Sequence, residues 1–149
     1  MNNSNSNNLF EILLVEDSPA DILMTRQALH QNKVANPLCV AEDGEQAIHF
    51  LVEKSRTSQL PGLILLDLNL PKKSGREVLE FIKADTDLLN IPVVVLTTSK
   101  DNEDVVGSYN LHANCYISKP MDFSKFVDVV KVIKEFWIGI ATLPCSVKK

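Results

Sequence analysis

The sequence is poor in cysteine, contains no long apolar run and has no excess of basic charge. Its three cysteines, Cys39, Cys115 and Cys145, lie far apart and show neither CxxC nor Cys/His spacing. The odd count and this spacing argue against a disulfide framework or a zinc site, and predict reduced thiols in a cytoplasmic protein. No apolar run approaches the ~20 residues that a membrane-spanning helix needs.

The charge balance gives no reason to expect binding to nucleic acid or to an anionic membrane. The 149 residues include 15 Lys and Arg against 19 Asp and Glu, for a net charge of -4. We find no basic cluster and no recognisable helix-turn-helix, so no DNA-binding module is expected. The hydrophobic fraction of 45% is typical of a soluble globular protein able to bury a core, and the length fits one domain.

The two ends of the chain differ from its middle. Residues 1–9, MNNSNSNNL, lack the basic and apolar segments of a signal peptide, and this polar tract predicts a disordered tail. Residues 139–149 are expected to form an apolar C-terminal tail. The folded domain is therefore expected over residues 10–138.

Five continuous apolar runs predict the strands of a parallel sheet, because strands covered on both faces do not alternate with polar residues. Segments with helical periodicity follow each run, so the order is strand–helix repeated and the expected fold is α/β and doubly wound. The predicted strands are 12–15, 38–41, 63–66, 93–96 and 115–117, and the predicted helices are 21–30, 46–53, 75–83, 104–111 and 122–138.

Polar side chains stand where these strands end. Ligands of such sheets bind outside the carboxyl ends of the strands. Three carboxylates brought together there would repel one another, and a hard divalent cation such as Mg²⁺ relieves that repulsion. With an ammonium and a hydroxyl beside them, they would form a socket for a phosphoryl group with an acid inside to receive it. The residues at these ends are Glu16, Asp17, Asp67, Thr97 and Lys119.

Taken in order, these residues resemble the response-regulator receiver domain of two-component signalling. The resemblance covers Glu16-Asp17, the segment LLDLNLPKKSG around Asp67, Thr97 after an apolar strand, and Lys119-Pro120. It implies a flavodoxin-like five-stranded parallel sheet of order 2-1-3-4-5, flanked by five helices. It also implies a signalling protein and not an enzyme.

The resemblance assigns a role to each site residue. Asp67 is the phosphoacceptor, Lys119 pairs with it or with its phosphate, Thr97 moves to bond the phosphoryl group, and Tyr116 is the aromatic switch that follows. Mg²⁺ is held by Asp17 and Asp67, by Glu16 through water, and by the backbone carbonyl of Asn69. Pro71 and Gly75 match the loop after the acceptor.

Simpler interpretations exist for single residues. Asp67 alone could be a helix cap, Glu16-Asp17 could simply begin a helix, and Tyr116 could only fill a strand. Lys72-Lys73 is interpreted as a solvated loop. A metal phosphatase of the DxD type is disfavoured because Asn69 stands where its second acid is needed.

The last helix carries two apolar stripes where a surface helix needs one. The first, expected to face the core, is Phe123, Phe126, Val127, Val130, Ile133 and Trp137; the second is Val129, Val132 and Phe136. The second stripe predicts a homodimer through the fourth helix, fifth strand and fifth helix, unless the tail folds back over it. The tail FWIGIATLP and the loops 32–36 and 55–60 resemble single-domain regulators paired with phytochrome-type kinases.

The function implied is phosphoryl acceptance on Asp67 from a partner histidine kinase, with a conformational change as the output. Two alternatives stay open. One is a phosphorelay shuttle to a histidine phosphotransfer protein, and the other is a pseudoreceiver scaffold that acts without phosphorylation. The intact set of acids argues against the second.

Overall fold

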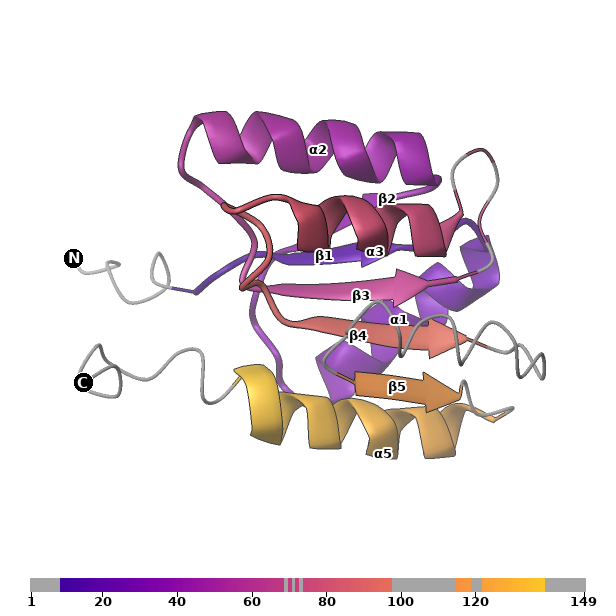
Figure 1. Ribbon diagram of the computed structural model, residues 1–149. Helices are drawn as coiled ribbons and strands as arrows, with labels where there is room; N and C mark the ends of the chain where they lie inside the picture. Colours follow the sequence, from indigo (N-terminus) through magenta and orange to yellow (C-terminus); the bar gives the residue numbers. More distant parts are fainter. Residues whose placement is uncertain are drawn as a thin grey trace.

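The computed structural model describes residues 9–68, 70, 72, 74–97, 115–118 and 122–138, with the backbone alone for 97, 115, 116, 118, 137 and 138. These residues form a five-stranded parallel sheet of order β2-β1-β3-β4-β5, so the predicted topology is confirmed. The strands run side by side in Figure 1, and their carboxyl ends meet at one edge. The strands are β1 (Ile12–Val15), β2 (Leu38–Ala41), β3 (Leu63–Asp67), β4 (Val93–Thr97) and β5 (Cys115–Ser118).

The helices begin where side chains cap them. Ser18 Oγ accepts a hydrogen bond from the Asp21 amide (3.2 Å), and Asp43 Oδ1 accepts one from the Gln46 amide (2.8 Å). Such caps satisfy amides that have no partner inside the helix. This is why the first two helices begin two residues earlier than periodicity alone predicts. The helices are α1 (Pro19–Gln31), α2 (Gly44–Arg56), α3 (Gly75–Ala84) and α5 (Phe123–Ile133), which a π-helical turn (Lys134–Ile138) extends. The predicted helix 104–111 lies outside the described residues.

Two apolar cores cover the two faces of the sheet. Successive strand residues point to opposite faces, so Leu13 and Val15 enter one core and Ile12 and Leu14 the other. Helices α2 and α3 cover the first face, and α1 and α5 cover the second (Figure 1). The four residues of β1, Ile12 to Val15, are all buried, as a continuous apolar run predicts for a strand in a doubly covered sheet.

Helix α5 buries the first of its two stripes. Phe126, Val130 and Ile133 are buried in the second core, whereas Val132 and Phe136 are 46% and 58% exposed. Val129 and Val127 are half-buried against the same core, as is Phe123. The core-facing prediction is thus confirmed for the described side chains, among which Trp137 is not included.

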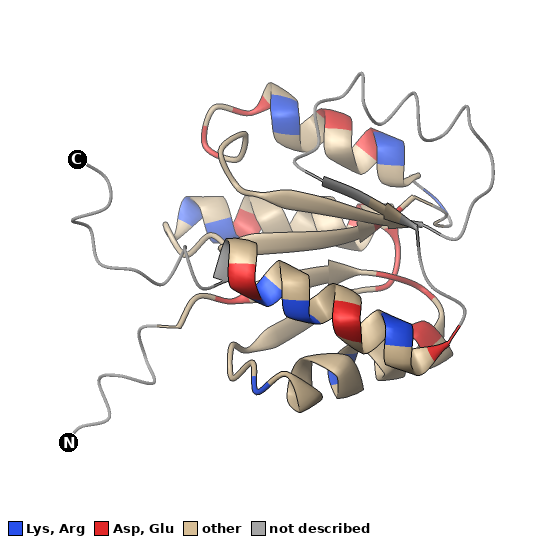
Figure 2. Ribbon diagram, turned by 90° about the horizontal axis from the view of Figure 1, so that it is seen from below, with Lys and Arg blue, Asp and Glu red and all other residues tan. Residues whose placement is uncertain are grey.

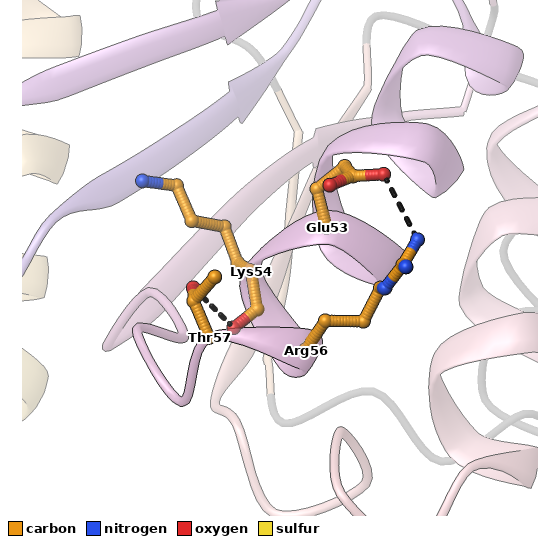
Figure 3. A network of polar contacts seen from close by, with 4 residues as sticks. All are labelled: Glu53, Lys54, Arg56 and Thr57. Atoms are coloured by element: carbon orange, nitrogen blue, oxygen red, sulfur yellow. Dashed lines mark hydrogen bonds and ion pairs between the residues drawn. The ribbon is translucent and has the colours of Figure 1, made fainter.

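The carboxyl end of α2 lies away from the strand ends that carry the site residues, and side-chain contacts hold it in place. Thr57 Oγ1 donates to the Lys54 carbonyl (3.2 Å), and Arg56 pairs with Glu53 at 3.5 Å (Figure 3). The Lys54 side chain extends the other way, to Glu11 before β1 (3.5 Å). Cys39 in β2 lies half-buried nearby, and burial, followed by the Glu11 charge, raises the pKa of its thiol. Within the described residues, no helix is long and apolar enough to cross a bilayer.

Candidate functional site

Three carboxylates meet at the carboxyl edge of the sheet. Strands β1 and β3 are neighbours, with Val15 opposite Leu66, so the residues that follow lie side by side. Glu16, Asp17 and Asp67 each offer an oxygen within 4.8 Å of the others. Glu16 and Asp67 are only 2% and 7% exposed, and Asp17 is exposed. The structure therefore brings together the three acids that the sequence predicts at this edge.

The backbone around Glu16 holds the cluster in place. The Glu16 amide donates to the Ala41 carbonyl (2.9 Å), which continues the pairing of β1 with β2. The Glu16 carboxylate accepts a hydrogen bond from the Ser18 amide (3.3 Å), and the Ser18 side chain caps α1. The acid is therefore tied to both the sheet and the first helix.

The cluster has the ligand chemistry of a divalent-cation site. Two unit charges at 4.8 Å repel by about 3.5 kcal/mol at an effective dielectric constant of about 20. Buried carboxylates in such a group gain from a cation between them, and oxygen ligands of this kind suit Mg²⁺ or Mn²⁺. The residues present thus fit the predicted Mg²⁺.

The loop after Asp67 turns back directly onto the strand end. The Gly75 amide donates to the Leu68 carbonyl (3.1 Å), and a Cβ at Gly75 would lie 2.4 Å from the Asp67 carbonyl oxygen. A side chain has no room there, so glycine is needed for the close approach of the two backbones. Ser74 and Glu77 form a reciprocal capping box that starts α3 at this point.

The other predicted site residues are only partly described. Thr97 is the last residue of β4 and pairs with Ser118 of β5, so its backbone lies at the same edge of the sheet. Tyr116 lies in β5 opposite Val95, and its side chain is outside the described part. Asn69 and Lys119 are also outside the described residues.

Asp43 is a further acid at this edge that the sequence analysis did not single out. It follows β2, it is buried, and its carboxylate both caps α2 and lies 3.7 Å from the Lys72 ammonium. Its spacing to Gln46 is a capping signal that could have located it. Figure 2 shows acidic segments in the loops that follow the strands, consistent with a concentration of negative charge at this edge.

Comparisons with known proteins agree with this geometry. The family described as the response regulator receiver domain matches residues 12–131. Response regulator Rcp1 from Synechocystis sp. is 47% identical over 137 residues, which cover 91% of this chain and 93% of Rcp1. The crystal structure of the phosphorylated cyanobacterial phytochrome response regulator RcpA has a TM-score of 0.83 at 47% identity, covering 91% of this chain and 99% of RcpA.

A second solved structure concerns the metal. The Mn²⁺-bound form of Rcp1 has a TM-score of 0.80 at 47% identity and covers 91% of this chain and 99% of that one. The fold, the acidic cluster and the match over residues 12–131 lead to one conclusion. This chain belongs to the response-regulator receiver-domain family of signalling proteins.

Proposed function

We propose that this chain accepts a phosphoryl group on Asp67 from a partner histidine kinase, in a Mg²⁺-dependent reaction. The observation that carries the proposal is the placement of Asp67 at the end of the central strand β3, within 4.8 Å of oxygens from Glu16 and Asp17. Burial holds the Asp67 carboxylate in one place, and the adjoining acids supply cation ligands beside it.

The chemistry of the chain's own residues follows from this placement. A carboxylate oxygen of Asp67 attacks the phosphorus of a phosphohistidine in line, the P–N bond breaks, and the imidazole nitrogen leaves with the electron pair. Asp17, Asp67, the backbone carbonyl of Asn69 and, through water, Glu16 would hold Mg²⁺, which would supply positive charge against the phosphoryl oxygens when bound. Lys119 adds an ammonium charge to the same oxygens. The chain itself receives the group, so we assign it no enzymatic turnover of a separate substrate.

The output is a change of shape that begins at β4 and β5. The new phosphoryl oxygens draw the Thr97 hydroxyl toward them, and Tyr116 on the neighbouring strand follows. Both strands end at the edge that carries Asp67, so a local charge acts on the face built by β5 and α5.

The proposed kinase is of the phytochrome type and the proposed compartment is the cytoplasm. Support for the kinase type comes from the 47% identity to Rcp1 and to the phytochrome response regulator RcpA, over 91% of this chain. Residues 10–138 form the proposed receiver domain, and the expected tails lie outside the described residues except for residue 9.

The proposed assembly is a homodimer through the fourth helix, β5 and α5. Val132 of α5 and Phe136 of the π-helical turn that extends it are exposed large apolar side chains, four residues apart and so on one helical face, with the half-buried Val129 one turn before Val132. A second copy would cover this face by a symmetric contact.

Intact-mass spectrometry tests the phosphoryl acceptor. The wild type, Asp67→Asn and the control Asp128→Asn, an exposed aspartate on α5, are incubated with Mg²⁺ and a small acyl-phosphate donor. We expect one Mg²⁺-dependent phosphoryl adduct on the wild type and on the control, and none on Asp67→Asn. An adduct on folded Asp67→Asn would refute the acceptor, and no adduct on any folded protein would favour the pseudoreceiver.

A further inference from the structure

Lys72, between β3 and α3, makes an ion pair with Asp43, the residue that caps α2. Lys72 has a φ of 61°, in the left-handed region that residues with a side chain seldom adopt. Its ammonium lies 3.7 Å from Asp43 Oδ2. A strained backbone persists where the surrounding structure holds it, so the contact with Asp43 is a candidate for that support.

Asp43 is a fixed partner for this lysine. Its side chain is 9% exposed, and its other oxygen, Oδ1, accepts a hydrogen bond from the Gln46 amide at 2.8 Å. Gln46 in turn accepts a hydrogen bond from the Glu42 amide (2.9 Å), which closes the start of α2. The carboxylate therefore cannot follow Lys72 if the loop moves, and it acts as an anchor.

The anchor is also connected to the acidic cluster. Asp43 lies two residues after Ala41, whose carbonyl accepts the hydrogen bond from the Glu16 amide. The loop that Lys72 belongs to begins directly after Asp67 and returns to it through Gly75. The ion pair therefore ties the loop that follows Asp67 to the framework that holds Glu16.

We propose that the Lys72–Asp43 ion pair positions the loop after Asp67 and thereby sets the affinity of the acidic cluster for Mg²⁺. The inference rests on the proposed function, because the loop matters through the phosphorylation site that it borders. Lys72 is a positioning residue and does not touch the reacting atoms. Its side chain is 59% exposed, as the interpretation of a solvated loop expects, and the ion pair with Asp43 is an additional contact.

A positioning role and a purely electrostatic role of Lys72 predict opposite effects of its substitution on Mg²⁺ affinity. If charge alone mattered, removing the Lys72 cation would strengthen Mg²⁺ binding and removing the Asp43 anion would weaken it, with additive effects. If the ion pair positions the loop, each substitution weakens binding, and the double substitution is no worse than either single one. The sign of the Lys72 effect therefore separates the two.

The experiment measures Mg²⁺ binding by isothermal titration calorimetry on the full chain. The variants are Lys72→Gln, Asp43→Asn, the two together, and Lys72→Arg, which keeps the charge. Asparagine is as good a helix cap as aspartate, so Asp43→Asn preserves the start of α2. Lys33→Gln is the matched control, because Lys33 is an exposed lysine with a φ of 59° that follows α1.

We expect each single loss to raise the Mg²⁺ dissociation constant by about threefold, the scale of one exposed ion pair. The double variant should show the same threefold change, and Lys72→Arg and Lys33→Gln should bind as the wild type does. Opposite signs for Lys72→Gln and Asp43→Asn, or wild-type affinity in both, would overturn the proposal.

Adduct formation on the wild type, followed in parallel by mass spectrometry, distinguishes the two levels of the argument. If the wild type is phosphorylated and the variants bind Mg²⁺ with unchanged affinity, the positioning role alone is refuted. If the wild type forms no adduct and the variants still lose Mg²⁺ affinity together, the proposed phosphoryl acceptor is refuted and the role of the ion pair is supported.

Discussion

Gly75→Ala should damage the candidate site more than it damages the fold. The new Cβ would lie 2.4 Å from the Asp67 carbonyl oxygen and 2.5 Å from the Leu68 Cα, both of them backbone atoms that cannot rotate away. The backbone after Asp67 must therefore move by at least 0.6 Å to reach even a 3.0 Å separation, since 3.0 minus 2.4 is 0.6. That movement displaces the acceptor relative to Glu16.

The cost in stability can be worked from the same contact. Overpacking of this kind costs about 1–3 kcal/mol. The better helix propensity of alanine returns up to about 1 kcal/mol at the first position of α3. With the full return, the net loss is up to about 2 kcal/mol, which lowers Tm by up to roughly 8 °C in a domain of this size. The domain stays folded at 25 °C, so its reactivity can be measured.

The assay is the initial rate of phosphoryl incorporation from a small acyl-phosphate donor, alongside Tm by calorimetry. We expect the rate to fall at least tenfold, because errors of about 1 Å in placing a reacting group cost up to 100-fold. Gly62→Ala is the control, since its Cβ would meet the Phe10 side chain before β1 and so stress the structure away from Asp67. It should lower Tm with no change in rate. A Gly75→Ala protein with wild-type Tm and rate would refute the reasoning.

Two further outcomes test the cation site and the α5 face. Mg²⁺ at ten times its dissociation constant should stabilise the wild type by about 1.4 kcal/mol, seen as a rise in Tm that Asp67→Asn reduces; an equal rise in both would exclude Asp67 as a ligand. Phe136→Asp should weaken self-association measured by light scattering, whereas Leu23→Asp, an equally exposed apolar position on α1, should not; an unaltered dimer in Phe136→Asp would place the interface elsewhere.

The sheet could be predicted from the sequence because burial on both faces leaves a plain signal. The runs 12–15 and 38–41 coincide with β1 and β2, and the other three strands each extend one residue further, to Asp67, Thr97 and Ser118. A strand's last residue needs only backbone pairing and no apolar side chain, so hydrophobicity alone stops one residue short. The helix starts were less predictable, because side-chain caps determine them.

The acidic cluster could be predicted because topology brings the ends of parallel strands together. The Lys72–Asp43 pair could not, since nothing in the chemistry of lysine favours a left-handed backbone and 29 residues separate the partners, 72 minus 43. The close approach at Gly75 could be predicted only in part. Its glycine matches the resemblance, but the clash that requires it exists only once Asp67 and α3 are placed.

The burial of the acids explains why the edge of this sheet needs such support. Glu16 and Asp67 are nearly inaccessible to water, so their charges are poorly solvated and repel each other strongly. If the loop were unsupported, Asp67 could move outward to reduce that repulsion, and the cation ligands would lose their defined positions. The hydrogen bonds of Glu16 to β2 and α1, the backbone contact at Gly75 and the ion pair of Lys72 all act against that movement. The buried negative charge of the cluster is thus the source of its affinity for a cation and for the phosphoryl group that the cation accompanies.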